Sequence, residues 1–208
     1  MIETELYGGI LNLTETRLCL DFANTADWHA SEQPEEKLNR YSDLVSWAQE
    51  VGLITASEAL TLNQEAARRP VAAVEVLQRA VDLREALYRI FSAVAAGRSI
   101  EAADLTLLNR WLLEASGQMQ LVQTTDGFGW QWAAGEHPLE WMLWPVARSA
   151  ADLLISEDLD RVKECADDRG CGWLFLDTSR NQSRRWCSME SCGNRAKVRR
   201  HRSKSAAA

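Results

Sequence analysis

Four of the five cysteines in the 208-residue sequence lie close together, between positions 165 and 192. Five residues separate Cys165 from Cys171, four separate Cys187 from Cys192, and fifteen lie between the two pairs. Such a layout is typical of a zinc site with four thiolate ligands. Each short loop turns two sulfurs toward one point, and the spacer allows the second pair to complete a tetrahedron. The spacing therefore predicts one structural Zn²⁺ bound by these four cysteines.

Two disulfides, four unrelated thiols and an iron site are the alternatives to zinc. Disulfides conflict with the reducing cytoplasm expected for this chain, and unrelated thiols do not explain why four of five cysteines share one short segment. Iron also binds four thiolates, so the sequence favours zinc without excluding iron. The fifth cysteine, Cys19, stands between Leu18 and Leu20, which predicts a small buried side chain.

The segment around the four cysteines has few apolar residues, so a metal is expected to take the place of a hydrophobic core. WLFLD (173–177) predicts a strand between the two cysteine pairs. ESCGNRAKVRRHR (190–202) predicts a helix that begins near the second pair. This order of elements is typical of a treble-clef-like zinc finger, which we place in residues 158–208.

Charge is divided unevenly along the chain. Residues 1–178 carry 14 Lys and Arg against 29 Asp and Glu, a net charge of −15, whereas residues 179–208 carry nine Lys and Arg against one Glu, a net charge of +8. A basic end on an acidic protein indicates binding to nucleic acid or to anionic lipid. The alternative is a solvated tail without a partner. We expect nucleic acid as the partner, DNA in preference to RNA.

The candidate contacts to nucleic acid are the basic residues and one asparagine near the second cysteine pair. On the predicted terminal helix, Arg195, Arg199 and Arg202 share one face. In the alternative reading, which we favour for Asp177 and Asn181, hydrogen bonds of Asp177, Arg180, Asn181 and Asn194 hold the finger together. The full set of candidates is Arg180, Arg184, Arg185, Asn194, Arg195, Lys197, Arg199, Arg200 and Arg202.

Residues 1–157 are predicted to form a mainly helical domain, which makes the whole chain an α+β protein. Apolar periodicity predicts helices at 17–27, 43–52, 71–96, 101–114 and 139–155, with a kink or break at Pro145 in the last one. Apolar and polar residues alternate nearly throughout 119–133, around Asp126 and Gly127, which predicts a β-hairpin.

Two groups of residues in this helical domain could bind a small ligand. Asp21, Asn24 and Thr25 are spaced so that one helix would present them together. Trp141, Trp144 and Arg148 share a face of the later helix by the same spacing. Aromatic walls with one cation suit a small anionic or planar ligand. The alternative is a tryptophan core in which Arg148 pairs with Asp21 or Asp152.

Several functional classes find little support in the sequence. The three histidines are far apart, and no nucleophile elbow or phosphate-binding loop occurs, so we expect no enzyme activity. No run approaches 18 apolar residues and the first residues do not resemble a signal peptide. These features predict a cytoplasmic protein that does not cross a membrane.

The chain resembles a known family at both ends. Cys192-Gly193-Asn194-Arg195, within WLFLDTSRN and RRWCSMESCGNRAKVR, resembles the CGNR zinc finger, and all four cysteines match that pattern. LCLDFANT (18–25) and HPLEWMLWPVARSAADLL (137–154) resemble the ABATE domain, which precedes this finger in bacterial proteins. The resemblance implies a stress-related transcriptional regulator in which the first domain senses a ligand and the finger contacts nucleic acid.

Three further hypotheses concern partners. A single finger makes few base contacts, so a homodimer would increase specificity. The basic finger could instead bind RNA or an acidic protein, because phosphates and carboxylates attract the same cations. The acidic domain, with net charge −15, could also hold the basic segment in cis and mask it.

Overall fold

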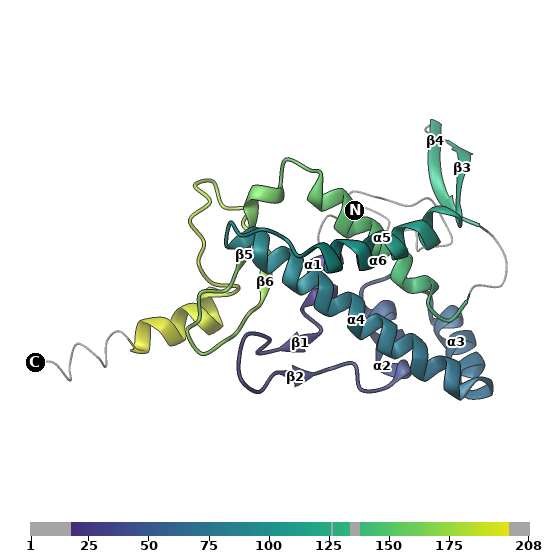
Figure 1. Ribbon diagram of the computed structural model, residues 1–208, viewed down its shortest axis with the longest axis horizontal. Helices are drawn as coiled ribbons and strands as arrows, with labels where there is room; N and C mark the ends of the chain where they lie inside the picture. The colour runs from purple at the N-terminus through teal and green to yellow at the C-terminus, as the bar shows by residue number, and fades with distance from the viewer. Residues whose placement is uncertain (1–17, 126, 134–137, 200–208) are drawn as a thin grey trace, which may run out of the picture.

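The computed structural model describes residues 18–125, 127–133 and 138–199 and shows a mainly helical molecule with small two-stranded sheets (Figure 1). This confirms the α+β class. The helices are α1 (Leu18–Ala23), α2 (Tyr41–Glu50), α3 (Ala56–Arg68), α4 (Pro70–Ala95), α5 (Ala102–Ser116) and α6 (Trp144–Leu154). The strands pair antiparallel as β1 (Ala26–Asp27) with β2 (Glu35–Glu36), β3 (Met119–Thr124) with β4 (Gly127–Trp132), and β5 (Val162–Glu164) with β6 (Leu174–Leu176).

The long helix α4 is the centre of the fold, and its extent confirms the helix predicted at 71–96. Pro70 lies at its first position, where a missing N–H costs nothing. Leu83, Leu87 and Ile90 are fully buried on the face that meets α1, α2, α3 and α5. Gly97 has a φ of 63°, the left-handed conformation that ends helices without steric strain. Among the described residues, no helix has both the length and the apolar character needed to span a bilayer.

The predicted β-hairpin is confirmed as β3 and β4, which follow α5 and project from the helical body (Figure 1). Leu121 pairs with Trp130 and Met119 with Trp132. Gly127 has a φ of 132°, which a side chain would disfavour. Asp126, the other predicted turn residue, lies outside the described residues.

One sequence expectation in the helical part needs correction. Helix α1 ends at Ala23 rather than continuing to 27. Thr25 Oγ1 donates to the carbonyl of Phe22, and local bonds of this kind compete with helix continuation. The break expected at Pro145 is confirmed. A 3₁₀ turn (Trp141–Leu143) precedes α6, and Pro145 lies in the first turn of α6, where proline is tolerated.

The hairpin β5–β6 belongs to the same hydrophobic core as the helices. Val162, Leu174 and Leu176 are buried with residues of α1, α4 and α6. The side-chain amide of Asn24 makes two hydrogen bonds to the backbone of Leu174 in β6. Its Nδ2 donates to the carbonyl oxygen at 2.9 Å, and its Oδ1 accepts from the N–H at 2.9 Å. The strands that carry the first cysteine pair are therefore fixed to the helical body by apolar packing and by one bidentate amide.

We expect Asn24→Ala to lower the free energy of unfolding by about 2–3 kcal/mol, because it leaves the buried N–H and carbonyl of Leu174 without partners. Urea denaturation followed by circular dichroism measures this change. Asn39→Ala is the matched control, since Asn39 is exposed and makes one local bond to Glu36. Equal effects of the two substitutions would show that the two hydrogen bonds between Asn24 and Leu174 add no stability.

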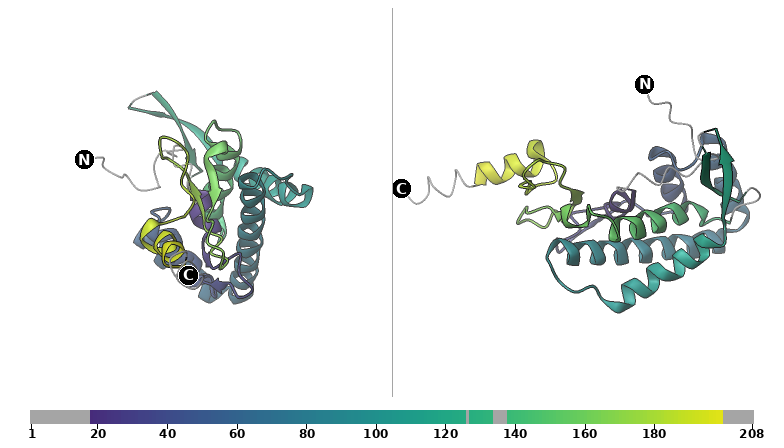
Figure 2. Two further views of the ribbon diagram at one scale, coloured as in Figure 1. Left: turned by 90° about the vertical axis from the view of Figure 1, so that its left-hand side faces the viewer. Right: turned by 90° about the horizontal axis from the view of Figure 1, so that it is seen from above.

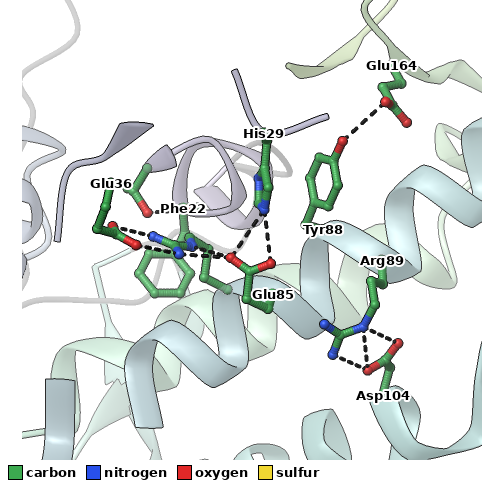
Figure 3. A network of polar contacts seen from close by, with 10 residues as sticks. Phe22, His29, Glu36, Glu85, Tyr88, Arg89, Asp104 and Glu164 are labelled. Atoms are coloured by element: carbon green, nitrogen blue, oxygen red, sulfur yellow. Dashed lines mark hydrogen bonds and ion pairs between the residues drawn. The ribbon is translucent and has the colours of Figure 1, made fainter. Parts of the chain in front are cut away.

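A polar network connects α4 with the β1–β2 segment, as Figure 3 shows. The buried guanidinium of Arg84 donates to both carboxylate oxygens of Glu36 at 2.6 and 2.7 Å, and also to Glu85. His29 Nε2 lies 3.0 Å from Glu85, and the His29 ring stacks on Tyr88 at 3.6 Å. This arrangement surrounds one buried cation with carboxylates on two sides, as a buried charge requires.

The network makes the free energy of unfolding depend on pH in the acid range. The hydrogen bond from His29, with a further contribution from Arg84, lowers the pKa of Glu85 to about 2, and this outweighs the opposing effect of burial. A carboxyl group with a lowered folded-state pKa stabilises the fold above its unfolded pKa of about 4.3 and loses that contribution as pH falls toward 2. We expect Glu85→Gln to flatten the decline of unfolding free energy over this window, whereas exposed Glu75→Gln leaves it unchanged. Urea titrations at a series of pH values test both.

Candidate metal centre

The four clustered cysteines converge on one point in the structure. Cys165 follows β5, and Cys171 precedes β6. Cys187 precedes the π-helical turn Met189–Gly193 that begins the terminal helix, and Cys192 lies within this turn. Their four sulfur atoms all lie within 4.8 Å of one another. Helical residues 194–199 follow directly. We call the loop from Cys165 to Cys171 the first knuckle. The predicted order of this loop, a strand, the second cysteine pair and a helix is therefore present.

The sulfur positions fit a tetrahedral zinc ion. Tetrahedral bonds of about 2.3 Å place neighbouring sulfurs about 3.8 Å apart. The observed separations are 3.8 Å for Cys171–Cys187, 3.6 Å for Cys187–Cys192 and 3.6 Å for Cys171–Cys192. Four thiolates with no open position are the ligand set of a closed structural site, so the cluster fits one structural Zn²⁺.

The electrostatics of the sulfurs also favour a cation. Hydrogen bonds from neighbouring thiols hold the pKa of Cys165 well below its ordinary value, and its thiolate in turn raises the pKa of Cys171 and Cys187. Four thiols this close cannot all ionise by themselves, whereas a dication at their centre stabilises every thiolate. Zinc with four thiolates still carries a formal charge of −2. Arg195 offsets part of it, donating from Nη2 to Cys192 Sγ at 2.8 Å.

A buried aspartate inside the first knuckle binds the terminal helix. The side chain of Asp167 is fully buried, and its oxygens lie 3.0 Å from Arg169, 3.4 Å from Arg195 and 3.1 Å from Arg199. Arg199 also pairs with the exposed Asp168. Despite burial, hydrogen bonds from the Arg169 side chain and backbone N–H and from Arg199 hold the pKa of Asp167 well below its usual range. The acid pair between Cys165 and Cys171 was a signal in the sequence that our predictions missed.

A second buried aspartate organises the loop before Cys187. Asp177 accepts from Lys163 Nζ at 2.6 Å, from Ser179 Oγ at 2.6 Å and from the Arg184 N–H at 2.9 Å. The Arg184 guanidinium lies 4.5 Å from the ring centroid of Phe175. It also donates to the backbone carbonyls of Trp186 and Cys187. This matches the alternative reading in which Asp177 holds the finger together.

The structure divides the candidate nucleic-acid contacts into two groups. Arg184, Arg195 and Arg199 are half-buried and engaged inside the finger. Arg180, Arg185, Asn194 and Lys197 are exposed, and Asn194 Nδ2 bonds to the Glu190 carbonyl at 3.2 Å. Arg200 and Arg202 lie outside the described residues. Arg195 and Arg199 form ion pairs with Asp167 of the finger, and the Arg195 guanidinium also lies 5.2 Å from the ring centroid of Trp28 in the helical body.

The six candidate ligand residues do not form one surface. Asp21 is exposed, whereas Asn24 and Thr25 are buried and bond to backbone groups. Trp141 and Trp144 are core residues, and Trp144 packs against Trp132 at 5.6 Å. Arg148 pairs with Asp152 at 3.0 Å, as the tryptophan-core alternative proposed. Cys19 is fully buried, and burial raises its pKa to about 12, which agrees with a small apolar role.

The loop between β1 and β2 presses against the first knuckle. A Cβ on Gly170 would lie 2.6 Å from the Ser31 backbone, and one on Gly172 would lie 2.6 Å from the Ala30 nitrogen. Both glycines also have positive φ, so a side chain is disfavoured by the backbone conformation as well as by the close contact. Next to Cys165, Glu164 accepts from Ser92 Oγ of α4 at 2.6 Å. The helical body therefore fixes the positions of Cys165 and Cys171.

The second cysteine pair is held differently. Among the described residues, the main hydrophobic core contains none after Leu176. The segment 178–199 is instead attached by its two sulfurs, by the aspartates Asp167 and Asp177, and by the backbone bond from Ala166 to Arg185, with further contacts from Arg184 to Phe175 and from Arg195 to Trp28. The metal would thus bridge a part of the protein fixed by apolar packing and a part fixed by polar contacts.

Metal removal is expected to release residues 178–199 and to leave the helical core with β5 and β6 folded. We expect trypsin to cleave after Arg180 and Arg185 about tenfold faster in chelated, reduced protein, because these bonds then open locally. Mass spectrometry of timed digests measures the rates. Cys192→Ala should reproduce the effect and lower zinc content, whereas Cys19→Ala should not. Complete unfolding on chelation would contradict the separation into two parts.

Comparison with known protein families agrees with this geometry. The family model described as "Putative stress-induced transcription regulator" (ABATE) matches residues 16–157, and that of the CGNR zinc finger matches residues 161–205. No curated protein matches the sequence. The ABATE match spans most of the chain, and the zinc-finger match contains all four clustered cysteines. The chain therefore belongs to the ABATE family and carries a CGNR zinc finger after its ABATE region.

Proposed function

We propose that this protein is a transcriptional regulator that binds nucleic acid, DNA in preference to RNA, through the exposed cations of its zinc finger. The observation that carries this proposal is the placement of Arg180, Arg185 and Lys197 on the metal-bound segment of an otherwise acidic chain. Their charges are not used to neutralise the metal centre, which draws on Arg195 instead. Exposed cations on a rigid support are the usual means of binding phosphates.

The division of the basic residues limits which of them could touch nucleic acid. Arg195 and Arg199 face Asp167, so moving them to a phosphate would leave a buried carboxylate with fewer partners. Asn194 is exposed at the start of the terminal helix, where its amide could reach a base edge. Counting the basic residues outside the described part, about six phosphates would be neutralised.

The ABATE region, which matches a family described as a stress-induced transcription regulator, is proposed to respond to a ligand. A response could reach the finger because β6 is held by Asn24 and because Glu164, next to Cys165, bonds to α4. The proposal assigns no catalytic step to the protein. It places the protein in the cytoplasm, where thiols stay reduced and available to zinc.

Salt dependence tests the proposal. We expect the logarithm of affinity for a fluorescent DNA duplex to fall with the logarithm of salt concentration at a slope near −5, if about six phosphates are bound. Lys197→Gln should weaken binding to all sequences and reduce the slope by about 1. Arg110→Gln removes one exposed charge from α5, far from the finger in sequence, and should change neither. Fluorescence anisotropy of the zinc-loaded full chain gives both quantities.

Competition identifies the partner class. Unlabelled DNA, RNA of the same sequence and an acidic polypeptide are added to the preformed complex at fixed salt. DNA should compete best. A slope near zero would refute nucleic-acid binding, and stronger competition by RNA or by the polypeptide would assign the finger to that partner instead.

A further inference from the structure

The indole of Trp28 lies at the junction between the helical body and both parts of the zinc finger. Trp28 follows β1 in the segment that joins α1 to α2, and its side chain is half-buried. The Arg169 guanidinium lies 4.9 Å from the ring centroid of this indole, and the Arg195 guanidinium lies 5.2 Å from it. Arg169 belongs to the first knuckle and Arg195 to the terminal helix. One side chain of the body therefore contacts both parts of the finger.

The backbone of Trp28 has a conformation that large side chains rarely adopt. Its φ is 55°, which lies in the left-handed region. Its two neighbours in the chain are anchored by ion pairs. On one side, Asp27 pairs with Lys37 at 2.7 Å, and on the other, His29 Nε2 lies 3.0 Å from Glu85 of α4. A strained residue persists only where its surroundings fix it, and such residues are concentrated at functional sites.

The direction in which the terminal helix faces is set by contacts near its first turn. Arg195 turns inward, toward the indole and toward Asp167. Asn194 and Lys197, three residues apart, share a different face that is exposed. A rotation that moved Arg195 away from its partners would therefore turn Asn194 and Lys197 as well. The helix extends away from the helical body, as Figures 1 and 2 show in yellow, so a small rotation at its start changes the position of its whole length.

The contact between Trp28 and Arg195 lies at the wall of a cavity rather than inside a packed core. The cavity has a volume of about 380 Å³ and lies beside the metal centre, and its lining includes Trp28, Trp173, Ser191 and Arg195. Atoms that line a cavity have lost partners on one side. Removal of the indole would enlarge this cavity and would leave Arg195 with fewer contacts to the body.

We propose that Trp28 is the positioning residue of the terminal helix. Its indole, fixed in the helical body, attracts the Arg195 guanidinium and thereby sets the direction of the face that carries Asn194 and Lys197. Trp28 is thus a determinant of affinity that needs no contact of its own with nucleic acid. The effect on binding rests on the proposed function, whereas the effect on the helix does not.

Hydrogen exchange followed by mass spectrometry, on the reduced, zinc-loaded full chain, tests the contact in the absence of nucleic acid. Trp28→Gly removes the ring, and glycine adopts a φ of 55° without strain, so the body stays folded. We expect the amides of residues 193–199 to exchange about tenfold faster, with unchanged zinc content and unchanged exchange in α4. Trp28→Phe keeps an aromatic face and should restore most of the protection. Trp130→Ala is the matched control, since this indole is 40% exposed on the projecting hairpin, and it should leave exchange in the helix unchanged.

Binding to a fluorescent DNA duplex separates positioning from direct contact. Trp28→Gly should weaken affinity by at least about threefold at each salt concentration, because fewer molecules hold the helix in the binding orientation. The slope against salt should not change, since no phosphate contact is lost, whereas Lys197→Gln reduces it. Unchanged exchange of residues 193–199 in Trp28→Gly would overturn the proposal, as would equally faster exchange in α4, which would indicate a general loss of stability. If the wild-type protein binds no nucleic acid, the proposed function fails, and the exchange measurement still decides whether Trp28 positions the helix.

Discussion

The constraint on which the finger depends is the closeness of four cysteine sulfurs, all within 4.8 Å of one another, which can all be thiolates only when a cation lies among them. In the described part of the chain, the main hydrophobic core ends at Leu176, so apolar packing does not hold the segment that follows. Metal–sulfur bonds do not weaken in water as surface ion pairs do, and they fix Cys187 and Cys192 against a pair already built into the body. The position of every exposed cation near the second pair follows from that attachment.

Negative charges fixed inside the finger then determine which basic residues turn inward. The metal centre and two buried carboxylates, Asp167 and Asp177, are sites of negative charge inside the finger. Guanidiniums within reach turn inward, because a buried carboxylate without a partner costs more than the entropy of ordering an arginine. Arg180, Arg185 and Lys197 remain exposed to solvent. Net charge measured from the sequence therefore overstates the charge available to a partner, and Arg195 and Arg199 are the clearest examples.

Sequence reasoning succeeded where the signal is local and failed where it is not. The four cysteines, the helix α4 and the hairpin around Gly127 were predicted because spacing, a 3.6-residue period and alternation each describe one element. The role of Asn24 was not predicted, since its partner Leu174 is 150 residues away and is contacted through the backbone. Trp141 and Trp144 show the same limit, because periodicity places them on one face but does not reveal whether that face meets a ligand or the core.

The shared core changes how the two family regions should be regarded. A finger on a free linker could change its orientation without cost, whereas here β5 and β6 contribute Val162 and Leu174 to the core of the helical body. Separating them would expose this apolar surface and break the bidentate bond of Asn24. Any structural change in the helical body would therefore act on the strands that lead into Cys165 and away from Cys171. The outer segment, held mainly by polar contacts, has the lower cost of movement, so such a change would alter its attachment before it altered the position of the first cysteine pair.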